Sequence, residues 1–149
     1  MTPRYGTPPE PGRHYRRRPG VYAVLWRAGR VLLTHQVEPR AEFQLPGGGI
    51  DPGETPLRAL HREVLEETGW RIAAPRRLGA FRRFTFMPEY DLWAEKLCVI
   101  YLARPLRRLG PPAEPGHSAH WVSPARAAEI VGNPGDAAFV RKVVRNFLA

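Results

Sequence analysis

Apolar residues in the first half of the chain follow a strand-like pattern before they take a helical one. Residues 21–36, VYAVLWRAGRVLLTHQ, hold two runs rich in β-branched and aromatic residues around Ala28 and Gly29. Two such runs around a glycine-containing break are typical of a β-hairpin. A short extended piece is expected at residues 43–45, in a loop that ends with the glycine triplet 47–49. The pattern therefore predicts strands up to this triplet and a change of structure after it.

Residues 56–68 carry helix signals at both ends. Thr55 is a typical N-cap, Pro56 suits the first helical position, and Gly69 is a typical C-terminal stop. We therefore expect a helix over this range. Its packing side is expected to consist of Leu57, Leu60 and Val64.

The acidic residues of the same helix lie on a different arc of the helical wheel. Glu63, Glu66 and Glu67 are three and four residues apart, so their side chains share one side of the helix. Ala59 lies on that side one turn earlier. Its small side chain is expected to leave room for an approaching group.

The rest of the chain mixes strands and short helices. Ser123-Pro124 is expected to open one helix that ends near residue 131, and a second helix is expected from near Asp136 to the C-terminus. Hairpins and helices with few clean βαβ units favour an α+β fold, with a mixed β-sheet between helices. The expected strands are residues 71–88, 95–106 and 120–122.

The N-terminal residues differ in composition from everything after them. MTPRYGTPPEPGRHYRRR is rich in Pro, Gly and Arg and has no hydrophobic period. We expect residues 1–18 to form a basic arm that is disordered or lies loosely on the domain. Residues 19–149 are expected to form one domain, because 149 residues is a usual size for a single domain with its own core.

Charge indicates a phosphate-bearing ligand without saying which one. The chain has 23 Lys and Arg against 14 Asp and Glu, a net charge of +9, and such a field attracts phosphates. The high arginine content also fits the composition of a source genome. The sequence has no run of 18 apolar residues, no apolar core of a secretory signal, and one cysteine, Cys98. These features predict a cytoplasmic protein with no membrane contact.

Two interpretations of the acidic helix stay open on the residues alone. Glu63 and Glu67 are four residues apart, and like charges at this spacing repel each other. A divalent cation reverses the sign of that interaction, and carboxylate oxygens suit Mg²⁺ or Mn²⁺. The alternative is a solvated acidic face in which Arg62 pairs with Glu66. The glycine triplet favours the metal, since glycine-rich turns often direct backbone groups at an ion or a phosphate.

Together these features resemble the Nudix box. Five residues separate Gly48 from Glu54, and seven residues separate Glu54 from the run Arg62-Glu63-Val64-Leu65-Glu66-Glu67-Thr68-Gly69-Trp70. The one mild departure is Trp70, where an aliphatic residue is more usual. The order of elements from about Pro19 onward also resembles the Nudix fold of MutT-like proteins, an α/β/α sandwich.

The resemblance implies hydrolysis of the diphosphate bond in a nucleoside diphosphate linked to another group, with Mg²⁺ or Mn²⁺ as cofactor. Glu66 and Glu67 would be metal ligands, and Glu63 would be a ligand or the general base. The carbonyl of Gly47 would also face the metal. Arg62 would orient a box glutamate through charge-assisted hydrogen bonds.

Further metal and substrate contacts must come from outside the box. Glu114 is the first candidate for an additional metal-binding carboxylate, and its competitors are Glu89, Asp91 and Glu95. Candidates for contact with the substrate's base or sugar are Phe43, Tyr90, Trp93 and Asn133. Each of these four has an ordinary structural alternative: packing for the aromatic residues, and a turn for the Asn-Pro pair. The histidines show no metal-ligand spacing.

Three functions are compatible with the pattern. The first is a pyrophosphohydrolase that acts on a small nucleotide derivative. The second is a non-catalytic module that binds a nucleotide or nucleic acid as a regulator, which the basic arm would suit. The third is hydrolysis at the 5′ end of an RNA. Intact glutamates at every box position favour the first, and the family resemblance also implies a possible homodimer.

Overall fold

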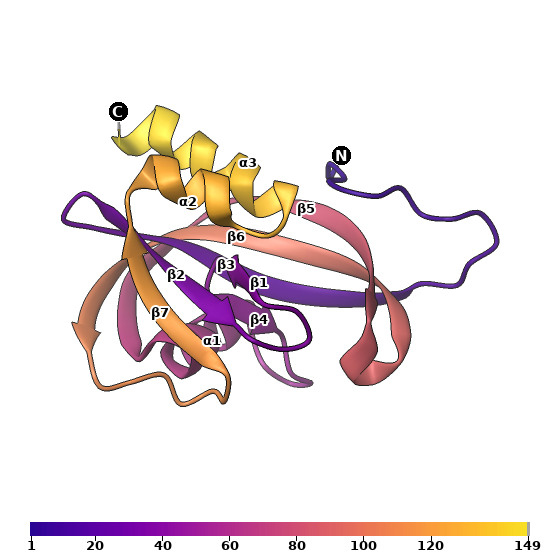
Figure 1. The fold of residues 1–149 in the computed structure, drawn as a ribbon, viewed down its shortest axis with the longest axis horizontal. Coiled ribbons are helices and arrows are strands. Elements are labelled where there is room, and N and C mark those ends of the chain that lie inside the picture. Colours follow the sequence, from indigo (N-terminus) through magenta and orange to yellow (C-terminus); the bar gives the residue numbers. More distant parts are fainter. Residues whose placement is uncertain (149) are drawn as a thin grey trace.

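A mixed β-sheet lies between helix α1 on one face and helices α2 and α3 on the other (Figure 1). The computed structural model describes residues 1–148. None of the helices in that range combines the length and apolar character that a bilayer crossing requires. The elements are β1 (Arg16–Arg27), β2 (Arg30–Gln36), β3 (Glu42–Gln44), β4 (Gly47–Gly49), α1 (Pro56–Thr68), β5 (Trp70–Met87), a 3₁₀ turn (Pro88–Tyr90), β6 (Leu92–Arg108), β7 (His117–Val122), α2 (Pro124–Ile130), α3 (Pro134–Val143) and a π-helical turn (Val144–Leu148).

Strand β1 is the centre of the sheet, whose strand order is β3-β2-β1-β6-β5. It runs parallel to β6 from the Arg16–Ala94 pair to the Leu25–Ala103 pair, and it is antiparallel to β2 and β4. Strands β5 and β6 form a long antiparallel hairpin, and β7 pairs with β2. The expected hairpin at Ala28 and Gly29 and the mixed sheet between helices are confirmed.

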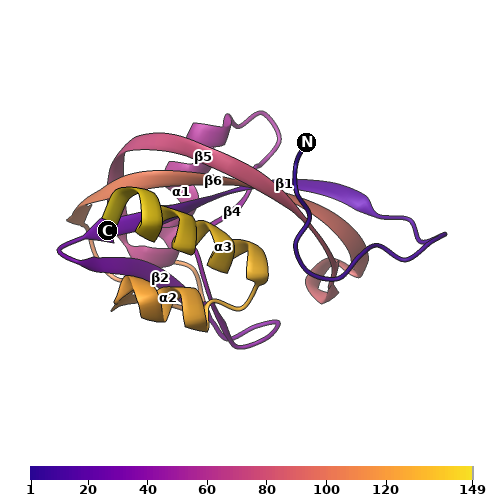
Figure 2. The same ribbon diagram turned by 90° about the horizontal axis from the view of Figure 1, so that it is seen from above.

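Alternating residues of β1 pack against opposite layers, as the pleat of a strand requires. Val21, Ala23 and Leu25 are fully buried in the cluster that holds the apolar side of α1. Val24 is fully buried in the second cluster, which contains Phe81 and residues of α2 and α3. Figure 2 shows the same three layers from above.

Helix α1 has the expected ends. The Thr55 side chain accepts a hydrogen bond from the Arg58 backbone N–H, and Gly69 adopts the left-handed conformation and donates to the Leu65 carbonyl at 2.8 Å. Two details of the expected packing are wrong. Leu57 is 46% exposed, whereas Ala59 is fully buried in the cluster that also holds Leu60 and Val64 and belongs to the packing side of the helix.

Helix α3 begins two residues earlier than expected. Asn133 is its N-cap, with Oδ1 accepting from the Asp136 backbone N–H at 2.8 Å, and Pro134 takes the first helical position. Helix α2 begins as expected, after a cap by Ser123. Both helices therefore follow the same cap-plus-proline pattern.

The N-terminal arm is joined to the edge of the sheet. Arg82 of β5 accepts a hydrogen bond from the Tyr5 N–H at 3.0 Å and donates one to the Pro3 carbonyl at 2.8 Å. The Tyr5 ring meets Phe81 edge-on. Strand β1 begins at Arg16, three residues before the expected start of the domain.

Candidate active site

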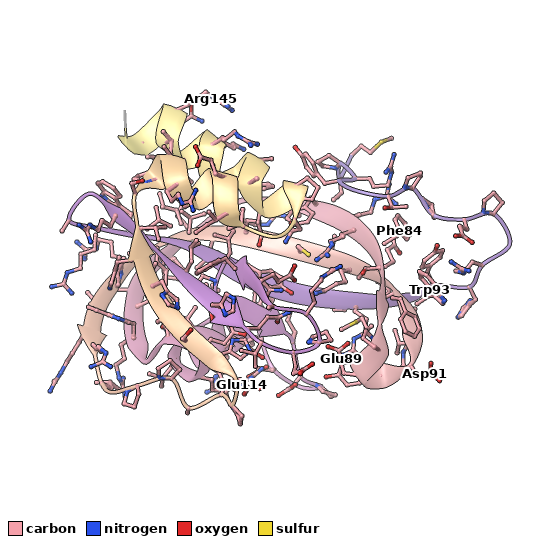
Figure 3. All side chains as sticks on the ribbon, viewed as in Figure 1. Phe84, Glu89, Asp91, Trp93, Glu114 and Arg145 are labelled. Carbon is pink, nitrogen blue, oxygen red and sulfur yellow. The ribbon has the colours of Figure 1, made fainter. Side chains whose placement is uncertain are left out.

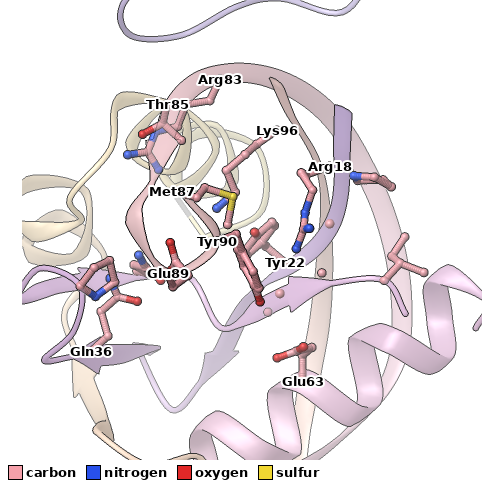
Figure 4. A pocket seen from close by; sticks show the side chains of 18 of the residues that line it. Arg18, Tyr22, Gln36, Glu63, Arg83, Thr85, Met87, Glu89, Tyr90 and Lys96 are labelled. Atoms are coloured by element: carbon pink, nitrogen blue, oxygen red, sulfur yellow. The ribbon is translucent and has the colours of Figure 1, made fainter. Parts of the chain in front are cut away.

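A cavity of about 530 Å³ lies beside β4, between α1 and the end of the β5–β6 hairpin (Figure 4). We call it the α1 cavity. Acidic residues of α1 line one side of it and basic residues of three strands line the other. The lining residues used below are Arg16, Arg18, Glu63, Glu67, Arg83 and Lys96.

Arg62 joins the acidic residues into one network. Its Nε is 2.6 Å from Glu54 Oε2 and its Nη2 is 2.9 Å from Glu54 Oε1, a two-point contact. This hydrogen bonding lowers the pKa of Glu54 to about 2. Arg62 Nη1 also donates to Glu63 at 3.0 Å and to Glu66 at 3.3 Å, and Nη2 donates to the Gly49 carbonyl. The expected contact between Arg62 and box glutamates is therefore present.

Glu67 is nearly buried, with 7% of its surface exposed. Its Oε1 accepts a hydrogen bond from the Gly47 N–H at 3.0 Å. Burial raises the pKa of Glu67 well above its usual value, and the neighbouring Glu63 charge adds to the rise. Burial also raises the pKa of Glu63. A nearby positive charge would reverse both effects.

His117 of β7 lies next to Glu67, although its sequence neighbours give no signal of this. Its Nδ1 is 3.8 Å from Glu67 Oε2 and 3.0 Å from Thr34 Oγ1. Burial lowers the pKa of His117, so the imidazole is neutral near pH 7 and does not supply a charge to Glu67. The contact arises from the pairing of β2 with β7 and could not be found from local sequence.

The glycine triplet forms strand β4 rather than a turn. Its residues pair with Gly20, Val21 and Tyr22 of β1. A Cβ atom at Gly48 would lie 2.6 Å from Glu63 Oε2, well inside van der Waals contact. A side chain at this position would therefore displace the Glu63 carboxylate.

The acidic residues fit a divalent cation in their chemistry, although they are not gathered into a complete ligand set. Within residues 1–148, no three Asp, Glu, His or Cys side chains are arranged to hold a metal ion. Glu63 and Glu66 are held by Arg62, and the Gly47 N–H donates to Glu67. The donors are all hard oxygens, and the buried Glu67 has a raised pKa that a cation would lower. The set therefore suits Mg²⁺ or Mn²⁺.

The opposite side of the cavity carries cations without acidic partners. Arg16, Arg18, Arg83 and Lys96 form no ion pair with any carboxylate in the described part of the chain. Figure 4 shows Arg18, Arg83 and Lys96 across the cavity from Glu63. The Arg18 guanidinium also lies 4.5 Å from the centre of the Tyr90 ring. One cavity therefore presents carboxylates to one side of a ligand and free cations to the other.

The structure brings some of the outlying candidates to the cavity and leaves others away from it. Tyr90 and Glu89 line it. Glu114 is exposed in the β6–β7 connection, where its backbone N–H donates to the Glu66 carbonyl at 2.9 Å (Figure 3). Glu95 instead pairs with Arg82, and Asp91 is exposed at the hairpin turn.

Phe43 and Asn133 do not line the α1 cavity, and neither does Trp93, which lines a second cavity described below. Phe43 packs edge-on against His35 and His120, with ring centroids 4.7 and 5.3 Å away, and is part of the core beside α2. Asn133 is 8% exposed, and its side-chain oxygen caps α3. The structural alternative therefore accounts for both residues.

The sequence model of the NUDIX domain matches residues 16–143, and the chain belongs to this family. The fold agrees with solved structures. A NUDIX hydrolase from Nitrosomonas europaea superimposes with a TM-score of 0.71 at 22% identity, covering 87% of this chain and 90% of that one. A MutT protein from Bacillus halodurans gives the same TM-score and identity, covering 87% and 83%.

Curated relatives match over shorter segments. An RNA pyrophosphohydrolase from Helicobacter pylori is 44% identical over 61 residues, which cover 38% of this chain and 39% of the relative. A Bacillus subtilis protein, provisionally named as an 8-oxo-dGTP diphosphatase, is 32% identical over 74 residues, half of each chain. The matched segments thus span half or less of these relatives.

Proposed function

We propose that the protein is a divalent-cation-dependent pyrophosphohydrolase that cleaves the diphosphate bond of a nucleotide derivative. The observation that carries the proposal is the α1 cavity, in which Glu63 faces Arg18 and Lys96 and which Glu67 also lines. A diphosphate with a bound cation has both kinds of charge, so it matches both sides of this cavity. A solvated acidic face would not require a buried glutamate or free cations opposite it.

Glu63, Glu66 and Glu67 are the residues proposed to hold the cation, with Glu114 and Gly47 as additional candidates. When bound, the cation supplies charge neutralisation at the diphosphate and raises the acidity of water. The Glu66 side chain is 37% exposed and is oriented by Arg62 Nη1 at 3.3 Å. Arg62 holds Glu63 through a hydrogen bond of 3.0 Å.

Residues of the chain bind the diphosphate, orient it and accept a proton. Arg18, Arg83 and Lys96 bind phosphate oxygens and orient the diphosphate. A water oxygen forms a bond to one phosphorus, the bridging P–O bond breaks, and the bridging oxygen leaves with the electron pair. Glu63 takes the proton of the attacking water, a role suited to a carboxylate whose pKa burial has raised.

The substrate class proposed is a nucleoside with a chain of two or more phosphates. The relatives are named as an RNA pyrophosphohydrolase and, provisionally, as an 8-oxo-dGTP diphosphatase, and both names describe hydrolysis of phosphate chains on nucleotides. Tyr90 lines the cavity with 55% of its surface exposed and is the proposed stacking surface for the first base.

The test is hydrolysis of a panel of nucleoside triphosphates, dinucleoside polyphosphates and nucleotide sugars by the full chain with Mg²⁺ or Mn²⁺. Glu63→Gln should lower kcat by about 10²- to 10⁴-fold, since it removes the proton acceptor. The matched control is Glu129→Gln, because Glu129 is exposed on α2 and pairs only with Arg126.

Cation binding is tested separately by thermal unfolding. Mg²⁺ or Mn²⁺ should raise Tm in the unmodified chain, because a ligand that binds only the folded state stabilises it. The rise should be smaller in Glu67→Gln. No turnover on any substrate combined with tight nucleotide binding would replace the enzyme by a regulatory nucleotide-binding module.

A further inference from the structure

A second cavity, of about 580 Å³, lies between the N-terminal arm and the β5–β6 hairpin. We call it the arm cavity. It shares lining residues with the α1 cavity, among them Gln36, Arg40 and Thr85, so the two meet along one edge. The aromatic residues that line it are Tyr15, Phe84, Phe86 and Trp93.

These four aromatic residues form a connected group. Figure 3 shows two of them, Phe84 and Trp93, on the β5–β6 hairpin. The Tyr15 ring meets Phe84 and Trp93 edge-on, with centroids 5.0 and 6.1 Å away, and Phe86 lies 5.1 Å from Trp93. The Arg13 guanidinium of the arm is 3.8 Å from the centre of the Trp93 ring. Even so, Phe86 is 39% and Trp93 is 38% exposed. The cluster is held in position while part of its ring surface stays accessible to a ligand.

The arm cavity and the α1 cavity differ in whether their basic residues have acidic partners. Its basic residues already have acidic partners: Arg13 pairs with Glu10 at 3.1 Å and Arg40 with Glu42 at 3.8 Å. The α1 cavity, by contrast, has free cations. A phosphate group therefore finds its partners in the α1 cavity, whereas the arm cavity suits a flat group without charge.

We infer that the arm cavity binds a second nucleobase of the substrate. This inference rests on the proposed function, because the phosphates of the same molecule would occupy the α1 cavity. Bases stack on aromatic rings and on arginine with little dependence on sequence. The substrate class is then a molecule with a nucleoside beyond the reacting phosphates. It is either a dinucleoside polyphosphate or the second nucleotide of an RNA with a 5′ triphosphate.

The experiment compares three ligands that differ in their second base. They are a nucleoside triphosphate, a dinucleotide with a 5′ triphosphate, and a dinucleoside tetraphosphate. KM is measured for each with the full chain and with Trp93→Ala, Trp93→Phe and Phe86→Ala. The control is Phe147→Ala, because Phe147 is 40% exposed, lies under Arg76, and lines neither cavity.

Trp93→Ala should raise KM about tenfold for at least one ligand with two bases and leave KM for the single nucleotide unchanged, since stacking on one ring contributes that order of affinity. In Trp93→Phe, KM for the same ligand should stay close to that of the unmodified chain, because phenylalanine keeps an aromatic ring. A loss confined to the tetraphosphate assigns the subsite to dinucleoside polyphosphates, and a loss confined to the triphosphorylated dinucleotide assigns it to RNA ends. Equal changes for all three ligands, or an equal effect of Phe147→Ala, would overturn the inference.

Equilibrium dialysis of the same ligands without divalent cation keeps the two proposals distinguishable. If none of the ligands is hydrolysed in the kinetic assays with Mg²⁺ or Mn²⁺, the pyrophosphohydrolase proposal fails. The second-base subsite still stands in that case if Trp93→Ala weakens binding of the two-base ligand selectively, and it falls if Trp93→Ala has no selective effect.

Discussion

The Arg62 guanidinium and the Glu54 carboxylate make two hydrogen bonds, at 2.6 and 2.9 Å, between α1 and the loop that precedes it. The same guanidinium reaches Glu63 and Glu66. Glu54 therefore fixes the orientation of Arg62, and Arg62 in turn fixes the carboxylates at the cavity.

Arg62→Lys should separate geometry from charge at this position. Lysine keeps the positive charge but cannot make the two-point contact with Glu54 while also reaching Glu63. We expect a 10- to 100-fold lower kcat, the usual cost of losing a residue that orients a site, with Tm nearly unchanged. Arg58→Lys, an exposed arginine of the same helix, is the control. Full activity in Arg62→Lys would show that charge alone is sufficient.

Gly48→Ala should act through Glu63 and not through the fold. The added Cβ would lie 2.6 Å from Glu63 Oε2, so the carboxylate must move away. A displacement of about 1 Å can cost about 100-fold in rate. Gly49→Ala is the matched control, because nothing lies within 4 Å of a Cβ at that position. Steady-state kinetics of both variants provide the comparison, and equal rates would contradict it.

Gly69→Ala should destabilise the protein more than Gly53→Ala. Both glycines have φ of +79°, so both substitutions carry the left-handed backbone cost of about 1–2 kcal/mol. At Gly69 the new Cβ would also collide with the Gly110 carbonyl oxygen, whereas at Gly53 it meets nothing within 4 Å. Denaturant unfolding of the two variants isolates the cost of the collision. Equal losses of unfolding free energy would mean that the β6–β7 connection, which contains Gly110, moves aside at no measurable cost.

Asp136 should make stability depend on pH. The residue is buried and accepts a hydrogen bond from the Leu45 N–H, and burial raises its pKa from 3.8 to about 6. The unfolded chain therefore releases this proton at lower pH than the folded chain does. The resulting stability is fully present below about pH 4 and is lost as pH rises to about 6, a loss of about 3 kcal/mol at 1.36 kcal/mol per pKa unit.

Asp136→Asn should remove this component, because the amide oxygen still accepts from Leu45 and carries no charge. The unfolding free energy of the variant should fall less between pH 4 and pH 6 than that of the unmodified chain. Urea unfolding across this range measures the difference. Glu129→Gln, an exposed acid, should leave the pH dependence unchanged. Parallel pH profiles for Asp136→Asn and the unmodified chain would contradict the assignment.

Local signals were sufficient for the elements whose ends depend on nearby residues. The capping of α1 by Thr55 and its end at Gly69 involve residues within four positions of each other, so sequence alone predicts them. The grouping of the box glutamates on one side of α1 follows from helical spacing in the same way.

Features created by strand pairing were beyond local prediction. The contact of His117 with Glu67 depends on the register of β2 with β7, and the free cations of the cavity depend on the parallel pairing of β1 with β6. The role of Asn133 was ambiguous because an Asn-Pro pair can form a turn, cap a helix or make a polar contact. In the structure Asn133 is buried and its side chain caps α3.

The acidic and basic residues of the α1 cavity come from different kinds of element, the former from a helix and the latter from strands. The carboxylates belong to successive turns of one helix, while the cations are contributed by β1 and by the β5–β6 hairpin, which are far apart in sequence. A substitution on one of these strands can thus alter which molecule is preferred while the reacting groups stay intact. A laboratory library confined to those strand positions would test this division while leaving the carboxylates of α1 unchanged.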